Sequence, residues 1–161
     1  MRYVIYPSVF LFSVVFFVLL AMLLLEENEA SNMVKYAHLT SYKNLFNEHP
    51  EYLLLGQGPG TEFYSLGFRE MTVKTEWTYL ELIRNYGIMC LPILYVILKP
   101  LYDLFALSVK QESTIAVALA YMIYLVIAGT NPLLLSSTGM FVLLSAYSYV
   151  ACIKNKSEKI Y

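Results

Sequence analysis

The stretch STIAVALAYMIYLVIAGTNPLLLSSTGMFVLLSAYSYVACI, residues 113–153, contains no Asp, Glu, Lys or Arg. A helix needs about 20 mostly apolar residues to cross the hydrocarbon core of a bilayer. This run of 41 residues is therefore long enough for two crossings. Asn131-Pro132 in its middle favours a tight turn between them. A second uncharged run, between Arg2 and Glu26, is long enough for one further crossing.

Composition agrees with a membrane protein. The 161 residues are 58% hydrophobic and only 14% charged, whereas a soluble domain carries about 25% charged residues. The net charge of −1 argues against a nucleic-acid partner. Cys90 and Cys152 both fall in apolar runs, and their spacing predicts neither a disulfide framework nor a metal site.

These runs predict an all-α polytopic membrane protein with about four transmembrane helices and one large external loop. We expect the helices over residues 1–25, 85–107, 113–129 and 132–153, the loop over 26–84 and a cytoplasmic tail over 154–161. The first run is longer than the apolar core of a signal peptide and lacks a clean cleavage site, which favours a spanning helix over a signal peptide.

Basic residues near the helix ends set the expected orientation. With four crossings they all fall on one side, the cytoplasmic side, together with both termini; they are Arg2, Lys99, Lys110, Lys154, Lys156 and Lys159. The acidic-rich segment 26–84 then lies outside the plasma membrane.

Within the external segment, Thr40–Phe46 predicts a short amphipathic helix. Thr75 is suited to cap a second helix that starts at Glu76, and we expect this helix to run through Gly87 into the next span. On it, Glu81 and Arg84 lie three residues apart and can pair.

The sequence LLLGQGPGTEFYS, residues 53–65, raises the question of a phosphate loop. A dinucleotide fingerprint has the spacing G-x-G-x-x-G and a Walker loop ends in Lys-Ser/Thr, and Gly56, Gly58 and Gly60 satisfy neither pattern. A plain tight turn requires only that these glycines adopt positive φ. Direct contact of the turn with an anion stays open, because backbone N–H groups in such turns can point at one.

Two titratable residues draw attention. Glu76 lies where the chain re-enters the membrane, where a raised pKa would suit a general base; the alternative is an acidic residue favoured by the helix dipole. His38 is either a surface histidine or a proton carrier. The external basic groups that could hold a phosphate are Lys43, Arg69, Lys74 and Arg84.

Three segments in order resemble one family. They are KYAHLTSYKNLFNEHPEYLLLGQGPGTEFYS (35–65), TEWTYLELIRNYGI (75–88) and AGTNPLLLSSTGM (128–140). Together they resemble the C-terminal third of the O-antigen and capsular polysaccharide polymerases (Wzy-type), which are relatives of the O-antigen ligases. The resemblance implies a GT-C-like helical fold in the bacterial inner membrane. It also implies joining of undecaprenyl-diphosphate-linked repeat units on the outer face, with no metal or other cofactor.

The resemblance also suggests roles for individual residues. Glu76 stands where the ligases have a histidine, and it is the candidate general base. His38, Lys43, Arg84 and Tyr79 are candidate substrate-binding residues, although Arg84 could instead pair structurally with Glu81. The family's arginine before the glycine turn has no counterpart here, where the region offers Lys35, His38 and Lys43.

The chain differs from the family mainly in length, because family members have about ten or more crossings and this chain is expected to have about four. We therefore expect a truncated or partial chain that is inactive alone and whose partners are lipid-linked glycans, the bilayer and missing helices or other assembly proteins. Two alternatives stay open. One is ligase-type glycan transfer, but the ligases have a histidine where this chain has Glu76. The other is a non-enzymatic membrane subunit or transporter fragment.

Overall fold

The computed structural model describes residues 30–109 and 111–158. The expected first crossing, residues 1–25, lies outside the described residues. The described part of the chain is mostly helical, in agreement with the expected all-α class.

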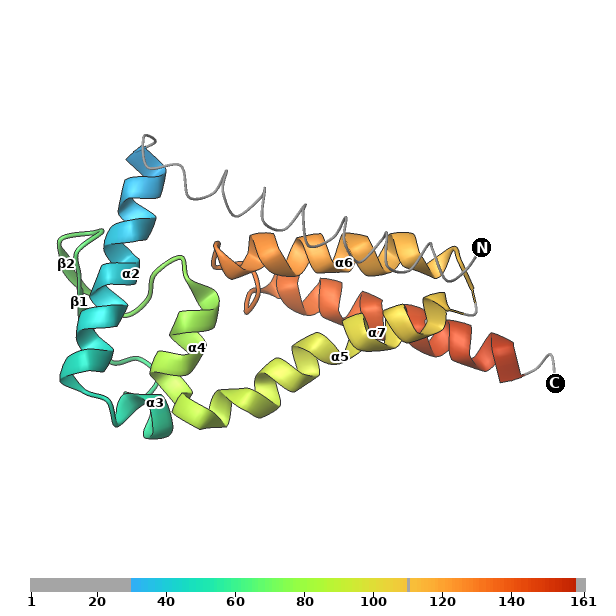
Figure 1. The fold of residues 1–161 in the computed structure, drawn as a ribbon, viewed down its shortest axis with the longest axis horizontal. Helices are drawn as coiled ribbons and strands as arrows, with labels where there is room; N and C mark the ends of the chain where they lie inside the picture. Colours follow the sequence, from blue (N-terminus) through green and yellow to red (C-terminus); the bar gives the residue numbers. More distant parts are fainter. Residues whose placement is uncertain (1–29, 110, 159–161) are drawn as a thin grey trace.

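Three long helices form one part of the molecule: α5 (Cys90–Ser108), α6 (Thr114–Gly129) and α7 (Ser137–Glu158). Figure 1 shows α5 running along α6 and α7. The α6 bounds nearly match the expected 113–129. Helix α7 begins five residues later than expected at position 132, because residues 131–136 form turns in which Leu133 N donates to Asn131 O at 2.7 Å.

The core lies between these helices. Leu104 of α5 and both Ala118 and Ala128 of α6 are fully buried. Small residues let helix backbones approach closely, and tyrosine hydroxyls add bonds between helices. Tyr121 on α6 donates to Ile97 O on α5 at 2.8 Å. The result is a packed three-helix unit whose outward side chains are largely apolar.

One helical run, Thr78–Ser108, is long and apolar enough to cross a membrane, and α6 is a shorter apolar helix. Exposed apolar side chains on this run include Tyr95, Val96 and Leu98. Their exposure suits contact with lipid better than contact with water. The crossing of α6 and α7 stays an expectation.

A polar cap, which we define as residues 30–86, lies at one end of the three helices (Figure 1). It contains α2 (Ala30–Glu48), the single-turn α3 (Tyr52–Leu55) and α4 (Thr78–Tyr86). It also contains a small antiparallel pair, β1 (Phe63–Ser65) and β2 (Glu70–Thr72), with Tyr64 opposite Met71. The helix expected at Thr40–Phe46 is thus the C-terminal half of a longer one.

The structure contradicts one expectation about α4 and bears out another only in part. The helix begins at Thr78, and its N-cap residue Trp77 makes no side-chain capping bond, so Thr75 is not the cap. The helical run does continue into α5 as expected, but it is interrupted at Gly87, which has φ +54 and begins the 3₁₀ turn η1 (Gly87–Met89). Such a φ ends a right-handed helix and is readily adopted by glycine alone.

Candidate functional site

A buried ion pair lies at the centre of the cap. Arg84 Nη2 is 2.7 Å from Glu81 Oε2, and Arg84 Nε donates to the same oxygen at 3.2 Å. Arg84 has no exposed surface and Glu81 is almost fully buried. The i, i+3 spacing on α4 places the two side chains on one face, as the sequence predicted.

Arg84 also gathers three other segments of the cap. Its Nη1 donates to Gln57 Oε1 at 2.7 Å and to Thr61 O at 3.0 Å, and its Nη2 donates to Val73 O. The guanidinium lies over the ring of Phe63, 4.6 Å from the ring centroid. Every guanidinium nitrogen is therefore bonded within the cap. Arg84 is a structural residue, and we retain no substrate contact for it.

Glu81 joins α4 to α2 and to the segment before α4. Its Oε1 accepts a bond from the Tyr42 hydroxyl at 2.5 Å and another from Thr75 N at 2.9 Å. Burial of the Tyr42 hydroxyl beside the Glu81 carboxylate raises the pKa of Tyr42 well above its usual value. Tyr42 therefore stays a neutral hydrogen-bond donor. The sequence did not predict this hydrogen-bond network around Glu81, because Tyr42 and Glu81 are 39 residues apart.

The glycine turn has the backbone that its sequence suggests. Gly56, Gly58 and Gly60 have φ values of +74, +101 and +83. In this region an L-residue with a Cβ is strained. The turn is closed by Thr61, whose N and Oγ1 both donate to Gly58 O.

The amides at the start of this turn are already used. Gln57 N donates to Arg84 O and Gly58 N donates to Asn85 O at 3.2 Å. The last carbonyls of a helix lack partners within the helix, so the turn supplies the missing donors for α4. Gly56 N donates to Tyr52 O at 3.0 Å. These three N–H groups are not available to cradle a phosphate, and the turn acts as a cap on α4.

His38 is fully buried against the β1–β2 connection. Its Nδ1 lies 2.8 Å from Ser65 Oγ, and its ring meets Phe68 edge-on at 4.5 Å. Burial lowers the pKa of His38, while the nearby carboxylates of Glu76 and Glu81 oppose the shift. Nε2 has no hydrogen-bond partner among the described residues. A side chain without exposed surface cannot touch a substrate directly, which corrects the expected binding role of His38.

Glu76 lies between α2 and the end of α6. The neighbouring Trp77 Nε1 donates to Lys35 O at 3.0 Å, and Thr78 Oγ1 donates to Asn131 O at 2.9 Å. Glu76 itself is half-buried, and no hydrogen bond from the described residues reaches its carboxylate. The residues that follow Glu76 are thus fixed to α2 and to the turn after α6.

The other two candidate residues are Tyr79 on α4 and Lys43 on α2. The Tyr79 hydroxyl donates to Leu125 O at 3.0 Å, and its ring packs against Gly129, so it joins α4 to α6. Lys43 is exposed on α2, and its side chain has no hydrogen bond to the described residues. Tyr79 is therefore held against α6, and Lys43 is exposed on α2.

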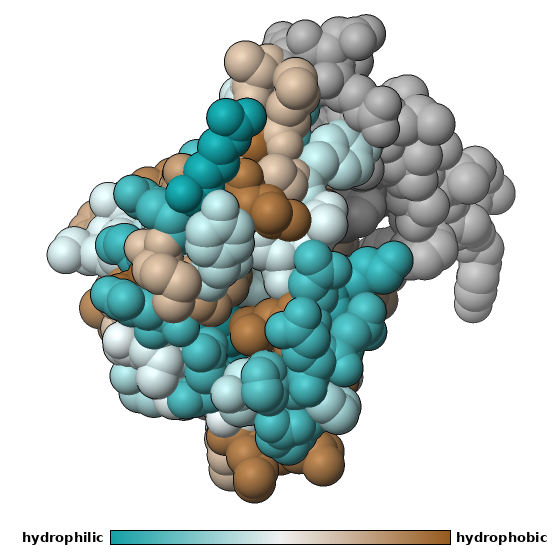
Figure 2. All heavy atoms as spheres, turned by 90° about the vertical axis from the view of Figure 1, so that its left-hand side faces the viewer, coloured by the Kyte–Doolittle hydropathy of each residue, from teal (hydrophilic) through white to brown (hydrophobic). Residues whose placement is uncertain are grey.

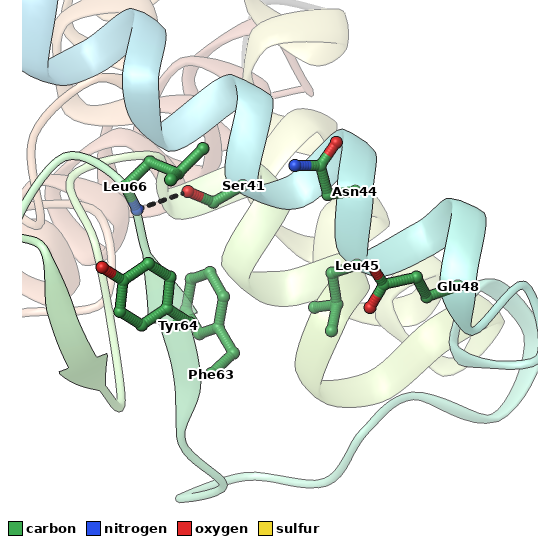
Figure 3. A pocket seen from close by; sticks show the side chains of 7 residues that line it. All are labelled: Ser41, Asn44, Leu45, Glu48, Phe63, Tyr64 and Leu66. Carbon is green, nitrogen blue, oxygen red and sulfur yellow. Dashed lines mark hydrogen bonds between the residues drawn. The ribbon is translucent and has the colours of Figure 1, made fainter.

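A shallow groove of about 190 Å³ lies between α2 and β1 (Figure 3). Asn44 and Glu48 bring an amide and a carboxylate from α2, and the ring of Tyr64 lies across from them. Ser41 Oγ on its wall accepts a bond from Leu66 N at 2.8 Å. Amide, carboxylate and aromatic groups suit the polar edges and apolar faces of a sugar. The i, i+3, i+7 spacing of 41, 44 and 48 marks one helix face, but the sequence could not say what faces it.

Within residues 30–109 and 111–158, no three His, Cys, Asp or Glu side chains are placed to hold one metal ion. Comparison of the chain with protein-family models, with curated proteins and with solved structures gave no match.

Proposed function

We propose that this chain is part of a membrane glycosyltransferase that polymerises undecaprenyl-diphosphate-linked repeat units into a surface polysaccharide. The observation that carries the proposal is the state of Glu76. Its carboxylate is half-buried and receives no hydrogen bond from the described residues. It lies at the junction between a polar cap and a run apolar enough to cross a membrane. A general base needs both a free oxygen and a fixed position.

In this proposal Glu76 takes the proton from a hydroxyl of the acceptor sugar. The oxygen of that hydroxyl attacks the anomeric carbon of the donor sugar. The bond between that carbon and the donor phosphate oxygen breaks, and undecaprenyl diphosphate leaves with the bonding electron pair. His38 is buried and bonded to Ser65, so in this proposal it supports the cap and does not touch the substrate. Lys43 is exposed and keeps the proposed role of contacting diphosphate, while the groove at Asn44 and Tyr64 is suited to a sugar of the acceptor.

We further propose that the chain crosses the inner membrane several times, with the cap outside and both termini in the cytoplasm. The cap and the C-terminal part of α7 lie at opposite ends of the helices, which supports this orientation (Figure 1). Since a complete pocket of this kind needs more helices, we expect activity only together with them.

The test is complementation of a polymerase-null host with this chain joined to the N-terminal helices of a full-length polymerase, read out as polysaccharide chain length. Glu76→Gln should leave only single-repeat product. Glu62→Gln is the matched control, because Glu62 is an exposed carboxylate of the same cap. Long chains from a normally expressed Glu76→Gln variant would show that Glu76 is not the base.

A non-enzymatic membrane subunit is the second candidate. It is favoured by the structural use of His38, Glu81 and Arg84, whose polar atoms hold the cap together. In that case neither Glu76→Gln nor a groove variant such as Tyr64→Ala would change chain length, whereas variants that unfold the cap would.

A further inference from the structure

An apolar corner lies where the cap joins α5. It consists of Leu53, Leu54 and Leu55 from α3, Ile88 and Met89 from η1, and Leu91 at the start of α5. Figure 2 shows hydrophobic side chains gathered at the lower edge of a face that is otherwise largely hydrophilic, at the level where α3 lies in Figure 1.

Glycines bring the two parts of this corner together. Gly56 follows α3 and Gly87 begins η1, and their backbones pack directly on each other. A Cβ built on Gly56 would lie 2.5 Å from Asn85 O, and one on Gly87 would overlap Leu54 O. Such contact leaves no room for side chains, and the amide bonds of the glycine turn to α4 fix it further. The leucines of α3 are therefore held beside η1.

The corner is unusually exposed for its composition. Leu55 is 80% exposed, Met89 66% and Leu54 61%. No charged residue occurs between Glu51 and Glu62 or between Arg84 and Lys99. Scattered exposed leucines are ordinary, but a contiguous uncharged group of large apolar side chains marks a surface that is covered in the working protein.

Lipid is the cover that the surroundings favour. The corner is continuous with the exposed apolar side chains of Tyr95, Val96 and Leu98 on the run that is long enough to cross a membrane. A bilayer around that run therefore extends toward the corner at its cap end. Tyr52 and Tyr86 flank the corner, and tyrosine is enriched at the boundary between acyl chains and headgroups.

We propose that the apolar corner inserts into the outer leaflet as an interfacial anchor and so fixes the depth of the cap. A surface element of this kind places its apolar side chains about 5–10 Å below the headgroups. The inference requires the Thr78–Ser108 run to cross the membrane and rests on the proposed orientation with the cap outside, but it is independent of glycosyl transfer.

The test places an environment-sensitive fluorophore on Leu55→Cys in the full chain carrying Cys90→Ala and Cys152→Ser. The protein is reconstituted in phosphatidylethanolamine–phosphatidylglycerol vesicles. We expect a nitroxide at carbon 5 of the acyl chain to quench this label at least twofold more than one at carbon 12, and iodide to have little effect. Glu62→Cys, in the exposed part of the cap, should show the reverse pattern, quenched by iodide and not by lipid.

Met89→Cys on η1 repeats the measurement from the other half of the corner and protects against a local effect at position 55. Tyr102→Cys, exposed twelve residues into α5, should be quenched more strongly by the deeper nitroxide. Iodide quenching at positions 55 and 89 equal to that at 62 would overturn the proposal. So would shielding from both quenchers, which would mean that protein covers the corner.

Discussion

Arg84 and Glu81 form a buried ion pair, Nη2 to Oε2 at 2.7 Å, around which α2, the glycine turn and the β-hairpin assemble. Removal of one partner leaves a buried charge without compensation. We expect Arg84→Met to reduce the free energy of unfolding by about 3–5 kcal/mol, the range for a broken buried pair. Thermal unfolding in detergent micelles, together with amide hydrogen exchange in the cap, measures this loss.

Two further variants make that test specific. Lys74→Met removes an exposed cation from the same cap and should change stability little. The double variant Glu81→Leu/Arg84→Met removes both charges and should recover part of the loss. A single variant Arg84→Met as stable as Lys74→Met would show that the pair does not hold the cap together.

Gly56 and Gly60 separate two effects of glycine in the same turn. Both have positive φ, and Gly56 combines it with ψ 160, so alanine at either position should cost about 1–3 kcal/mol of backbone strain. A Cβ at Gly60 meets nothing within 4 Å, whereas one at Gly56 would lie 2.5 Å from Asn85 O. We therefore expect Gly56→Ala to destabilise the cap clearly more than Gly60→Ala.

Hydrogen exchange gives this comparison a local readout. Gly56→Ala should lower the protection of the Gln57 and Gly58 amides, which donate to the end of α4, and Gly60→Ala should leave it nearly unchanged. Equal losses of stability and protection for the two variants would mean that backbone packing against α4 contributes nothing beyond the φ requirement.

Local patterns predicted the parts of this fold that depend on neighbours in sequence. The uncharged run 113–153 contains α6 and most of α7. A long apolar run favours helices because each helix satisfies its own backbone hydrogen bonds and leaves its apolar side chains free to pack. The pairing of Glu81 with Arg84 followed from helical spacing alone. The glycine spacing predicted a turn with positive φ, and the backbone has one.

Features that depend on distant partners were missed. Gly87 ends α4 with a φ of +54, and a side chain there would overlap Leu54 and Gly56, a close approach that the apolar sequence around it does not reveal. The β1–β2 pair is held by contacts to α2, such as Ser65 with His38. Burial of a histidine or arginine is decided by such partners, so the sequence could not show that His38 lies beyond the reach of substrate.

His38 should make the cap sensitive to pH. Burial lowers its pKa from about 6.5, and the carboxylates of Glu76 and Glu81 only partly oppose this. The unfolded chain therefore binds a proton more readily than the folded one, and stability rises with pH between the two pKa values. The stabilisation by neutral His38 is complete above about pH 6.5 and is lost as pH falls toward the lower, folded pKa.

The chain has two histidines, which allows a matched comparison. The unfolding temperature in micelles should fall between pH 7.5 and 5 for the unaltered chain and for His49→Asn, an exposed position. His38→Asn should lower stability at pH 7.5 but flatten this dependence. A slope unchanged by His38→Asn would assign the pH sensitivity to carboxylates elsewhere.

The orientation of the chain can be tested through exposed side chains at its two ends. Lys99 and Lys154 both bond the Asp103 carboxylate, at 3.0 and 3.1 Å, so basic residues of α5 and α7 meet away from the cap. Since cytoplasmic ends carry the excess of Lys and Arg, Glu62 should face outward and Lys156 inward. In a Cys90→Ala/Cys152→Ser background, an impermeant maleimide should label Glu62→Cys in intact spheroplasts and Lys156→Cys only after permeabilisation. The opposite labelling would invert the orientation, and equal labelling of both positions before permeabilisation would place the two ends on the same outer side.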